Sequence, residues 1–212
     1  MLKNRHREVI GLTRHFGAPR QSRGVDMGDV LGDQPSGAEA AERVRRPLRC
    51  GEPVIHEFDT ADGVRLRLSR FRGGAKGPVI LAPGFGTSAL AYTLDTTETN
   101  YPEYLYEHGY DVWVLDYRAS PALASGTTQF SLDDIATYDY PAAVEKVRAE
   151  SGAETVQIMA HCVGSLTMLM ALSLGLTGVR SAVASQLTLH PRAGALNELR
   201  AGIYAADVFD AL

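Results

Sequence analysis

Cysteine is scarce in this 212-residue chain, and both metal-ligand clusters and long apolar runs are missing from it. The two cysteines, Cys50 and Cys162, favour free thiols in a reducing compartment. The six histidines are scattered and no Cys-x-x-Cys pair is present, so the sequence offers no metal site. Residues 1–10 lead into polar sequence rather than the apolar core of a secretory signal. We therefore expect a cytoplasmic protein.

The chain also lacks a membrane-length apolar segment and an excess of basic charge. The longest near-apolar run, residues 166–176, is about half of the ~20 residues that a membrane span needs, so we expect no span. Net charge is −4, and residues 51–212 carry nineteen acidic against eleven basic side chains, which argues against a nucleic-acid surface. Residues 1–50 carry ten basic against six acidic side chains without interleaved aromatics, which is more typical of a solvated tail than of a binding arm.

The pattern of the chain changes near residue 51. Residues 1–50 show no sustained period and indicate a partly disordered extension or linker, whereas residues 51–212 alternate strand and helix patterns. An opening hairpin followed by this alternation predicts an α/β fold with a mostly parallel sheet. The expected strands are 54–60, 64–71, 78–82, 111–117, 155–159 and 181–189, and the expected helices are 99–108, two segments beginning at 131 and 141, 166–175 and 197–209.

The stretch TVQIMAHCVGS, residues 155–165, has the layout of a nucleophile elbow with cysteine in place of serine. The elbow is a strained strand-to-helix turn that tolerates only small residues two positions before and after the nucleophile, a demand that Ala160 and Gly164 meet. Cys162 would then stand at a helix N-terminus, whose dipole favours the nucleophilic thiolate. The alternative is that Cys162 is a small buried hydrophobe, as most lone cysteines are.

A glycine-containing loop, Pro83-Gly84-Phe85-Gly86, follows the apolar strand 78–82. Beside an elbow, the backbone N–H groups of Phe85 and Val163 would form an oxyanion hole. The alternative is an ordinary glycine turn. A third interpretation, the dinucleotide pattern G-x-G-x-x-A at residues 84–89, requires a helix that begins within the glycines, and polar residues intervene here. We expect no cofactor.

The general base and acid are harder to identify. His190 ends the last expected strand on the same sheet edge as the elbow, so it is the candidate base, with capping or packing as the alternative role. His161 is next to Cys162 and is predicted to be structural. Asp116, at the end of a central strand, is better suited to anchoring loops than to serving as the triad acid. Asp207 and Asp210 have no strand to position them.

With these features in place, residues 53–205 resemble the α/β-hydrolase superfamily. The greatest similarity is to the hydrolase-like domain that follows the flavin domain in large cholesterol-oxidase-like proteins of the glucose–methanol–choline oxidoreductase group. Residues 109–164 also resemble polyhydroxyalkanoate synthases, and dienelactone hydrolases likewise carry cysteine at the elbow. The segments that carry the likeness are DGVRLRLSRF, DTTETN, EHGYDVWVLDYRAS, SLDDIATYDYPAAV, AHCVGS and VRSAVASQLTLHP.

The resemblance implies an acyl-enzyme mechanism in which Cys162 attacks and the N–H groups of Phe85 and Val163 hold the oxyanion. Cysteine at the elbow directs the expectation to a small-molecule thioester or activated ester, with lipid or steroid esters as candidates. The superfamily places its acid and histidine after later strands, expected beyond Leu212, so the chain looks truncated at its C-terminus. The alternative is a non-catalytic domain that serves as a binding or interaction module. An unfinished sheet would expose an edge strand through which copies of the chain could pair.

Overall fold

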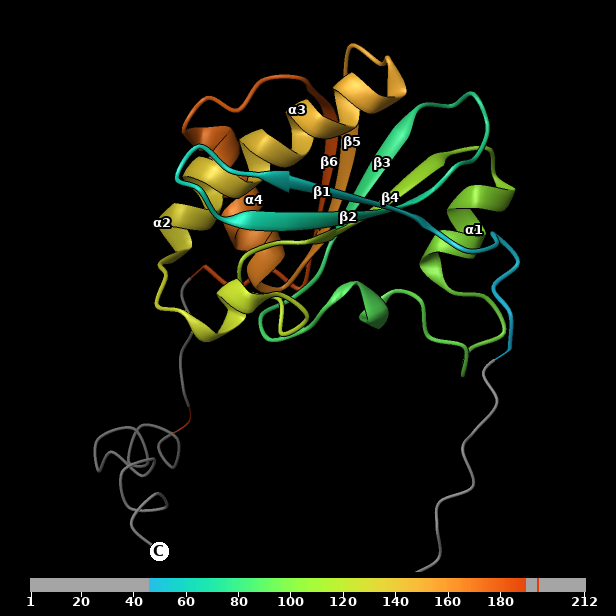
Figure 1. The fold of residues 1–212 in the computed structure, drawn as a ribbon, viewed down its shortest axis with the longest axis horizontal. Coiled ribbons are helices and arrows are strands. Elements are labelled where there is room, and N and C mark those ends of the chain that lie inside the picture. The colour runs from blue at the N-terminus through green and yellow to red at the C-terminus, as the bar shows by residue number, and fades with distance from the viewer. Residues whose placement is uncertain (1–45, 190–193, 195–212) are drawn as a thin grey trace, which may run out of the picture. The chain divides into compact units, whose positions relative to one another are not determined.

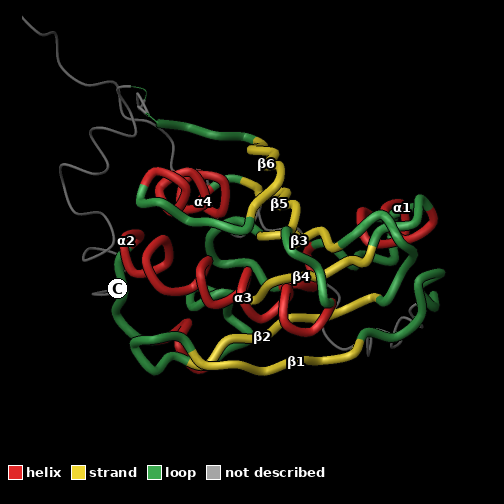
Figure 2. The backbone as a smooth tube through the Cα atoms, turned by 90° about the horizontal axis from the view of Figure 1, so that it is seen from above, coloured by secondary structure: helices red, strands yellow, loops and turns green. Residues whose placement is uncertain are grey.

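The computed structural model describes residues 46–189 and 194 (Figure 1). Six strands form one sheet in the order β1-β2-β4-β3-β5-β6, which Figure 2 shows as a row from β1 to β6. The pairs β1–β2 and β2–β4 are antiparallel, and the remaining pairs are parallel. The predicted α/β fold, mostly parallel with an antiparallel start, is confirmed. The strands are β1 (Val54–Asp59), β2 (Arg65–Phe71), β3 (Pro78–Ala82), β4 (Asp111–Asp116), β5 (Val156–His161) and β6 (Val179–Ser185).

The opening hairpin forms around a turn that glycine permits. Gly63 has φ 82, and the backbone N–H of Thr60 donates to the carbonyl of Val64 at 2.9 Å. Leu66 and Leu68 are buried as their alternation predicts. The expected polar face of β2 does not persist, because the last residues of β2 are buried on both faces: Arg70 bonds to the Glu150 carbonyl of α3 (Tyr140–Ser151), and Phe71 belongs to the cluster that includes Cys50. Arg70 is buried there in a bidentate ion pair with Asp111.

Helices cover both faces of the sheet. One buried cluster joins α3 and α4 to the sheet through residues such as Tyr140 and Met168, and the other lies beneath α1 and includes Cys50 and Val114. Figure 1 shows α3 and α4 together and α1 apart from them. Across the described residues, no helix is both long and apolar enough to cross a membrane. The helices are η1 (Ala89–Ala91), α1 (Tyr101–Glu107), η2 (Ala124–Thr127), α2 (Leu132–Asp134), the π-helical turn η3 (Ile135–Asp139), α3 (Tyr140–Ser151) and α4 (Val163–Ser173).

Two local differences from the expected elements have clear causes. The segments expected from 131 and 141 form one continuous helical stretch, because the π-helical turn η3 joins α2 to α3; Ser131 caps its start as predicted. The last described strand ends at Ser185 because Gln186 adopts φ 51, which does not fit a strand. The expected helix 197–209 lies outside the described residues. Pairing of copies through the exposed strand β6 stays a prediction.

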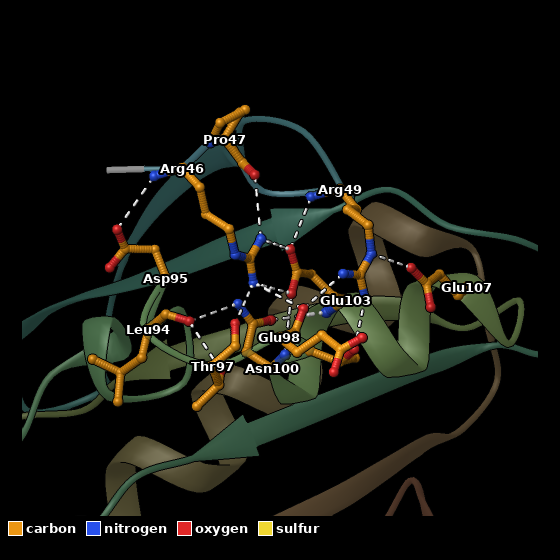
Figure 3. A network of polar contacts seen from close by, with 11 residues as sticks. Arg46, Pro47, Arg49, Leu94, Asp95, Thr97, Glu98, Asn100, Glu103 and Glu107 are labelled. Atoms are coloured by element: carbon orange, nitrogen blue, oxygen red, sulfur yellow. Dashed lines mark hydrogen bonds and ion pairs between the residues drawn. The ribbon is translucent and has the colours of Figure 1, made fainter. Parts of the chain in front are cut away.

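Residues 46–49 are held against α1 by a polar network (Figure 3). The Arg46 guanidinium donates to both carboxylate oxygens of Glu103, at 2.5 and 2.8 Å, and the Arg49 N–H donates to the same carboxylate at 2.9 Å. Asn100 caps α1, and its own N–H returns a hydrogen bond to Glu103, which completes a capping box. Glu103 therefore joins the segment before the hairpin to the start of α1.

We expect Glu103 to make stability depend on acid pH. The hydrogen bond from Arg46 lowers the pKa of buried Glu103 from 4.5 to about 2. The charged form is favoured in the folded state, so the contribution is complete above about pH 4.5 and is lost as the pH falls toward 2. Glu103→Gln should lower the free energy of unfolding at pH 7 by about 1–2 kcal/mol. Denaturant titrations between pH 7 and pH 2.5 measure this.

The matched control is Glu107→Gln. Glu107 lies on the same helix as Glu103, and its half-exposed carboxylate pairs with Arg49. We expect little change from this variant, because exposed ion pairs contribute little. A Glu103→Gln protein whose stability falls with acid as steeply as that of the unmodified chain would contradict the assignment.

Candidate active site

Cys162 occupies a strained turn between β5 and α4. Its φ of 53 and ψ of −119 lie in a region that non-glycine residues rarely adopt, and its side chain is exposed. The other cysteine, Cys50, is buried, and burial raises the pKa of its thiol to about 11. Both thiols are free, as expected. An accessible thiol therefore stands at a strand-to-helix turn of the type that presents nucleophiles.

Gly164 lets the start of α4 approach the end of β3. A Cβ added to Gly164 would lie 2.4 Å from the carbonyl oxygen of Pro83 and 3.0 Å from that of Ala82. On the other side of the elbow, Ala160 is fully buried and pairs with Ala82 of β3. The demand for small residues two positions before and after Cys162 thus has a direct steric cause.

Ser165 ties the elbow to the neighbouring strand β6. Its hydroxyl lies 2.8 Å from the Ala160 carbonyl and 2.9 Å from the Ser185 carbonyl, and it accepts the Ser185 N–H at 3.0 Å. The Cys162 N–H donates to the Ser185 carbonyl at 2.9 Å. Sequence reasoning did not single out Ser165; the available signal was a serine directly after the elbow glycine, Gly164.

The loop after β3 lies against the cysteine. A Cβ added to Gly84 would lie 3.3 Å from Cys162 Cβ, so the loop and the thiol-bearing residue are in contact range. Phe85 follows with a side chain that is 61% exposed. Val163 is the first residue of α4, where N–H groups have no carbonyl acceptor within the helix. Phe85 and Val163 thus lie in the two segments beside Cys162, the loop after β3 and the first turn of α4.

The described histidines do not pair with the thiol. His161 Nδ1 lies 3.5 Å from Ser185 Oγ, toward β6, in keeping with the structural role expected of it. His56 packs beside Trp113, and His108 Nδ1 lies 2.7 Å from the Tyr104 carbonyl. His190 lies outside the described residues. Within residues 46–189 and 194, no side chain hydrogen-bonds to Cys162 Sγ, and no group of three metal-ligating residues is present.

Asp116 anchors loops, as predicted. Its buried carboxylate accepts the Ala89 N–H at 2.8 Å and the Ser120 hydroxyl at 2.7 Å, and it is paired with Arg67. Ala89 begins η1, just after the loop that contacts Cys162, and Ser120 lies in the loop after β4. Asp116 therefore holds two loops at the edge of the sheet where Cys162 stands.

An apolar cleft of about 360 Å³ lies between the segment after η1 and the start of α1. Tyr92 forms part of its wall and donates its hydroxyl to the carbonyl of Ala82, at the end of β3. Leu94, Tyr101 and Tyr104 also line it, each with about half of its surface exposed. The cleft is suited to an apolar group.

Comparison with known proteins gives consistent results. The family model described as alpha/beta hydrolase fold matches residues 77–203. Lipase lipl-3 of Caenorhabditis elegans is 31% identical over 144 residues, which cover 59% of this chain and 36% of that protein. Triacylglycerol lipase 2 of Arabidopsis thaliana is 24% identical over 130 residues, which cover 52% of this chain and 31% of that protein. The chain thus spans less than half the length of these curated relatives.

Solved structures show the same fold. An alpha/beta hydrolase of a Penicillium species superposes with a TM-score of 0.54 and 21% identity, covering 74% of this chain and 53% of that one. An esterase of Pyrococcus furiosus gives a TM-score of 0.51 and 22% identity, covering 62% of this chain and 49% of that one. The resemblance to cholesterol-oxidase-like proteins stays a prediction.

Proposed function

Because the chain belongs to the α/β-hydrolase fold family, we propose that it hydrolyses carboxylic ester or thioester bonds through an acyl-enzyme on Cys162. The observation that carries the proposal is the exposed thiol on a strained turn, in contact range of Gly84 and at the start of α4. The lipase names of the curated relatives support an ester substrate.

In the proposed reaction the Cys162 thiolate attacks the acyl carbon, and the carbonyl oxygen becomes an oxyanion. The N–H groups of Phe85 and Val163 hold this oxyanion. When the oxyanion collapses, the bond to the leaving alcohol or thiol breaks and the leaving group takes a proton. Water then attacks the acyl-cysteine and releases the acid and the thiol. His190 remains the candidate base for the second step.

The proposed substrate has an apolar acyl or alcohol part, as lipid or steroid esters have. Supporting this, the chain has a mostly apolar cleft lined by Tyr92, Leu94, Tyr101 and Tyr104, and the Tyr92 hydroxyl bonds to the Ala82 carbonyl just before the loop that contacts Cys162. Cysteine as nucleophile favours thioesters and activated esters. A thiol is partly ionised without a neighbouring base, and the thiolate that forms is a strong nucleophile.

Trapping the acyl-enzyme tests the proposal. The full chain is mixed with a short acyl thioester, quenched with acid and digested, and peptide masses are measured. We expect the acyl mass on the peptide that contains Cys162 and no acylated peptide in Cys162→Ala. The buried Cys50 is the internal control for non-specific acylation. Acyl transfer that is equal in both proteins would overturn the proposal.

A non-catalytic binding module is the second candidate. It is favoured by one observation: within the described part of the chain, no side chain hydrogen-bonds to the thiol that would need activation. In that case an ester or thioester would bind, as followed by the change in tyrosine or tryptophan fluorescence, without any acyl mass appearing on Cys162. The trapping experiment therefore separates the two functions.

A further inference from the structure

Three successive backbone carbonyls at the end of β3 each accept a hydrogen bond from a side-chain hydroxyl. Parallel strand pairing stops here, so these carbonyls need other partners. Tyr92 and Tyr117 are buried, and burial raises the pKa of both, so their hydroxyls remain protonated donors. The bonds are Tyr92 to Ala82 at 3.0 Å, Tyr117 to Pro83 at 3.2 Å and Thr87 to Gly84 at 2.9 Å.

The third bond, from Thr87 to the Gly84 carbonyl, holds the peptide unit that carries the Phe85 N–H. The Gly84 carbonyl and the Phe85 N–H belong to one planar trans peptide, in which the two groups point in opposite directions. The Thr87 hydroxyl holds the carbonyl on the inside of the turn formed by residues 84–87. The Phe85 N–H is then directed out of the turn, and Gly84 itself lies beside Cys162.

The two tyrosines fix the peptides that lead into this turn. Tyr117 comes from the loop after β4 and Tyr92 from the segment after η1, so separate elements hold the Pro83 and Ala82 carbonyls. These same carbonyls lie against Gly164 at the start of α4. The loop is thus held at each of three successive peptides before a substrate arrives.

We propose that Thr87 is a positioning residue that presets the Phe85 N–H for an oxyanion, with Tyr92 and Tyr117 fixing the loop behind it. This rests on the proposed function, because it needs an oxyanion to form at Cys162. Fixed donors stabilise developing charge without reorganisation during the reaction. Thr87 is exposed and its hydroxyl closes only a local turn, so its removal affects the direction of the N–H more than the fold.

The test compares Thr87→Val, which keeps the shape but removes the hydroxyl, with Thr87→Ser, which keeps the hydroxyl. With a short acyl thioester we expect Thr87→Val to lower kcat about tenfold or more with little change in KM, and Thr87→Ser to restore kcat. The rate at which iodoacetamide alkylates Cys162 should be unchanged in both variants, because alkylation forms no oxyanion. Thr93→Val is the matched control, since Thr93 donates to the Leu90 carbonyl three residues before it, at 3.4 Å.

Equal kcat values for Thr87→Val and the unmodified chain would overturn the proposal, as would a loss that Thr87→Ser does not restore. If the unmodified chain hydrolyses no ester, the proposed function fails by itself and a second measurement decides the role of Thr87. A short aliphatic aldehyde adds reversibly to the thiol: sulfur bonds to the carbonyl carbon, and the carbonyl oxygen becomes an oxyanion that accepts a proton. Protection of Cys162 from iodoacetamide then gives the aldehyde affinity. We expect it to be about tenfold weaker in Thr87→Val alone, and equal affinities would overturn the proposal.

Discussion

Replacing Cys162 with alanine should lower kcat for a short acyl thioester by about 10⁴-fold or more, since removal of a covalent nucleophile leaves only binding and oxyanion stabilisation. The thermal unfolding temperature should stay within a few degrees of the parent value, because the side chain is exposed and fills no part of the core. Steady-state hydrolysis and thermal denaturation measure the two quantities.

Cys162→Ser makes the experiment more informative. A serine hydroxyl needs a neighbouring base to become nucleophilic, whereas a thiol is partly ionised without one. Over the residues that the structure describes, no histidine bonds to the thiol, so the serine variant should lose nearly as much activity as the alanine variant. Substantial activity in Cys162→Ser would show that a base reaches this position, and His190→Ala would then be the variant to examine.

Cys50→Ala is the matched control for the loss of a thiol. Cys50 is buried among the apolar side chains beneath α1, so its truncation should affect stability and leave kcat nearly unchanged. An active Cys162→Ala protein, or a Cys50→Ala protein that is inactive while folded, would contradict the assignment of the nucleophile.

The elbow could be predicted because its requirements are local in sequence. A strand pattern, a small residue at 160, cysteine at 162 and glycine at 164 lie within one short stretch, and each meets a steric demand of the same turn. The φ of 53 at Cys162 agrees with the strained turn expected from that stretch, whereas the approach of Gly164 to Pro83 involves a different strand and was not predicted. The same reasoning led correctly to the hairpin, the parallel strands and the loop-anchoring role of Asp116.

Contacts between distant residues could not be predicted in the same way. Arg46 and Glu103 are 57 positions apart, and nothing in the sequence near Arg46 indicates its partner. The pattern Asn100-x-x-Glu103 is a local signal for a capping box that would have placed the helix start correctly. The second role of Glu103, as acceptor from residues 46–49, appears only in the folded chain.

The hydroxyl groups of the site were missed for a similar reason. Tyr92, Tyr117 and Tyr140 look like ordinary aromatic core residues, and only the fold shows that their hydroxyls donate to carbonyls around the elbow. Buried tyrosines generally find such partners, but the sequence does not say which carbonyls these are. The burial of Arg70 at the end of β2 was missed for a comparable reason, because its partner Asp111 is 41 positions away in the sequence.

The close contact between Gly164 and the end of β3 affects both the elbow and the tyrosine hydrogen bonds, and Gly164→Ala tests it. The added Cβ would lie 2.4 Å from the Pro83 carbonyl oxygen and 3.0 Å from that of Ala82, distances that require backbone to move. The two carbonyls are the acceptors of Tyr117 and Tyr92, so their displacement would break hydrogen bonds of buried hydroxyls as well. We expect the free energy of unfolding to fall by about 1–3 kcal/mol or more.

The Gly164→Ala variant should lose more activity than its loss of stability alone explains. Moving the loop that carries the Phe85 N–H by about 1 Å can reduce the rate by about 10²-fold. Gly194→Ala is the control, because a Cβ there meets no atom of the described residues within 4 Å. Hydrolysis and denaturant unfolding of the two variants give the comparison. A Gly164→Ala protein with the stability and kcat of the parent would mean that the start of α4 does not press on the end of β3, and that the loop holding Phe85 is not fixed by this contact.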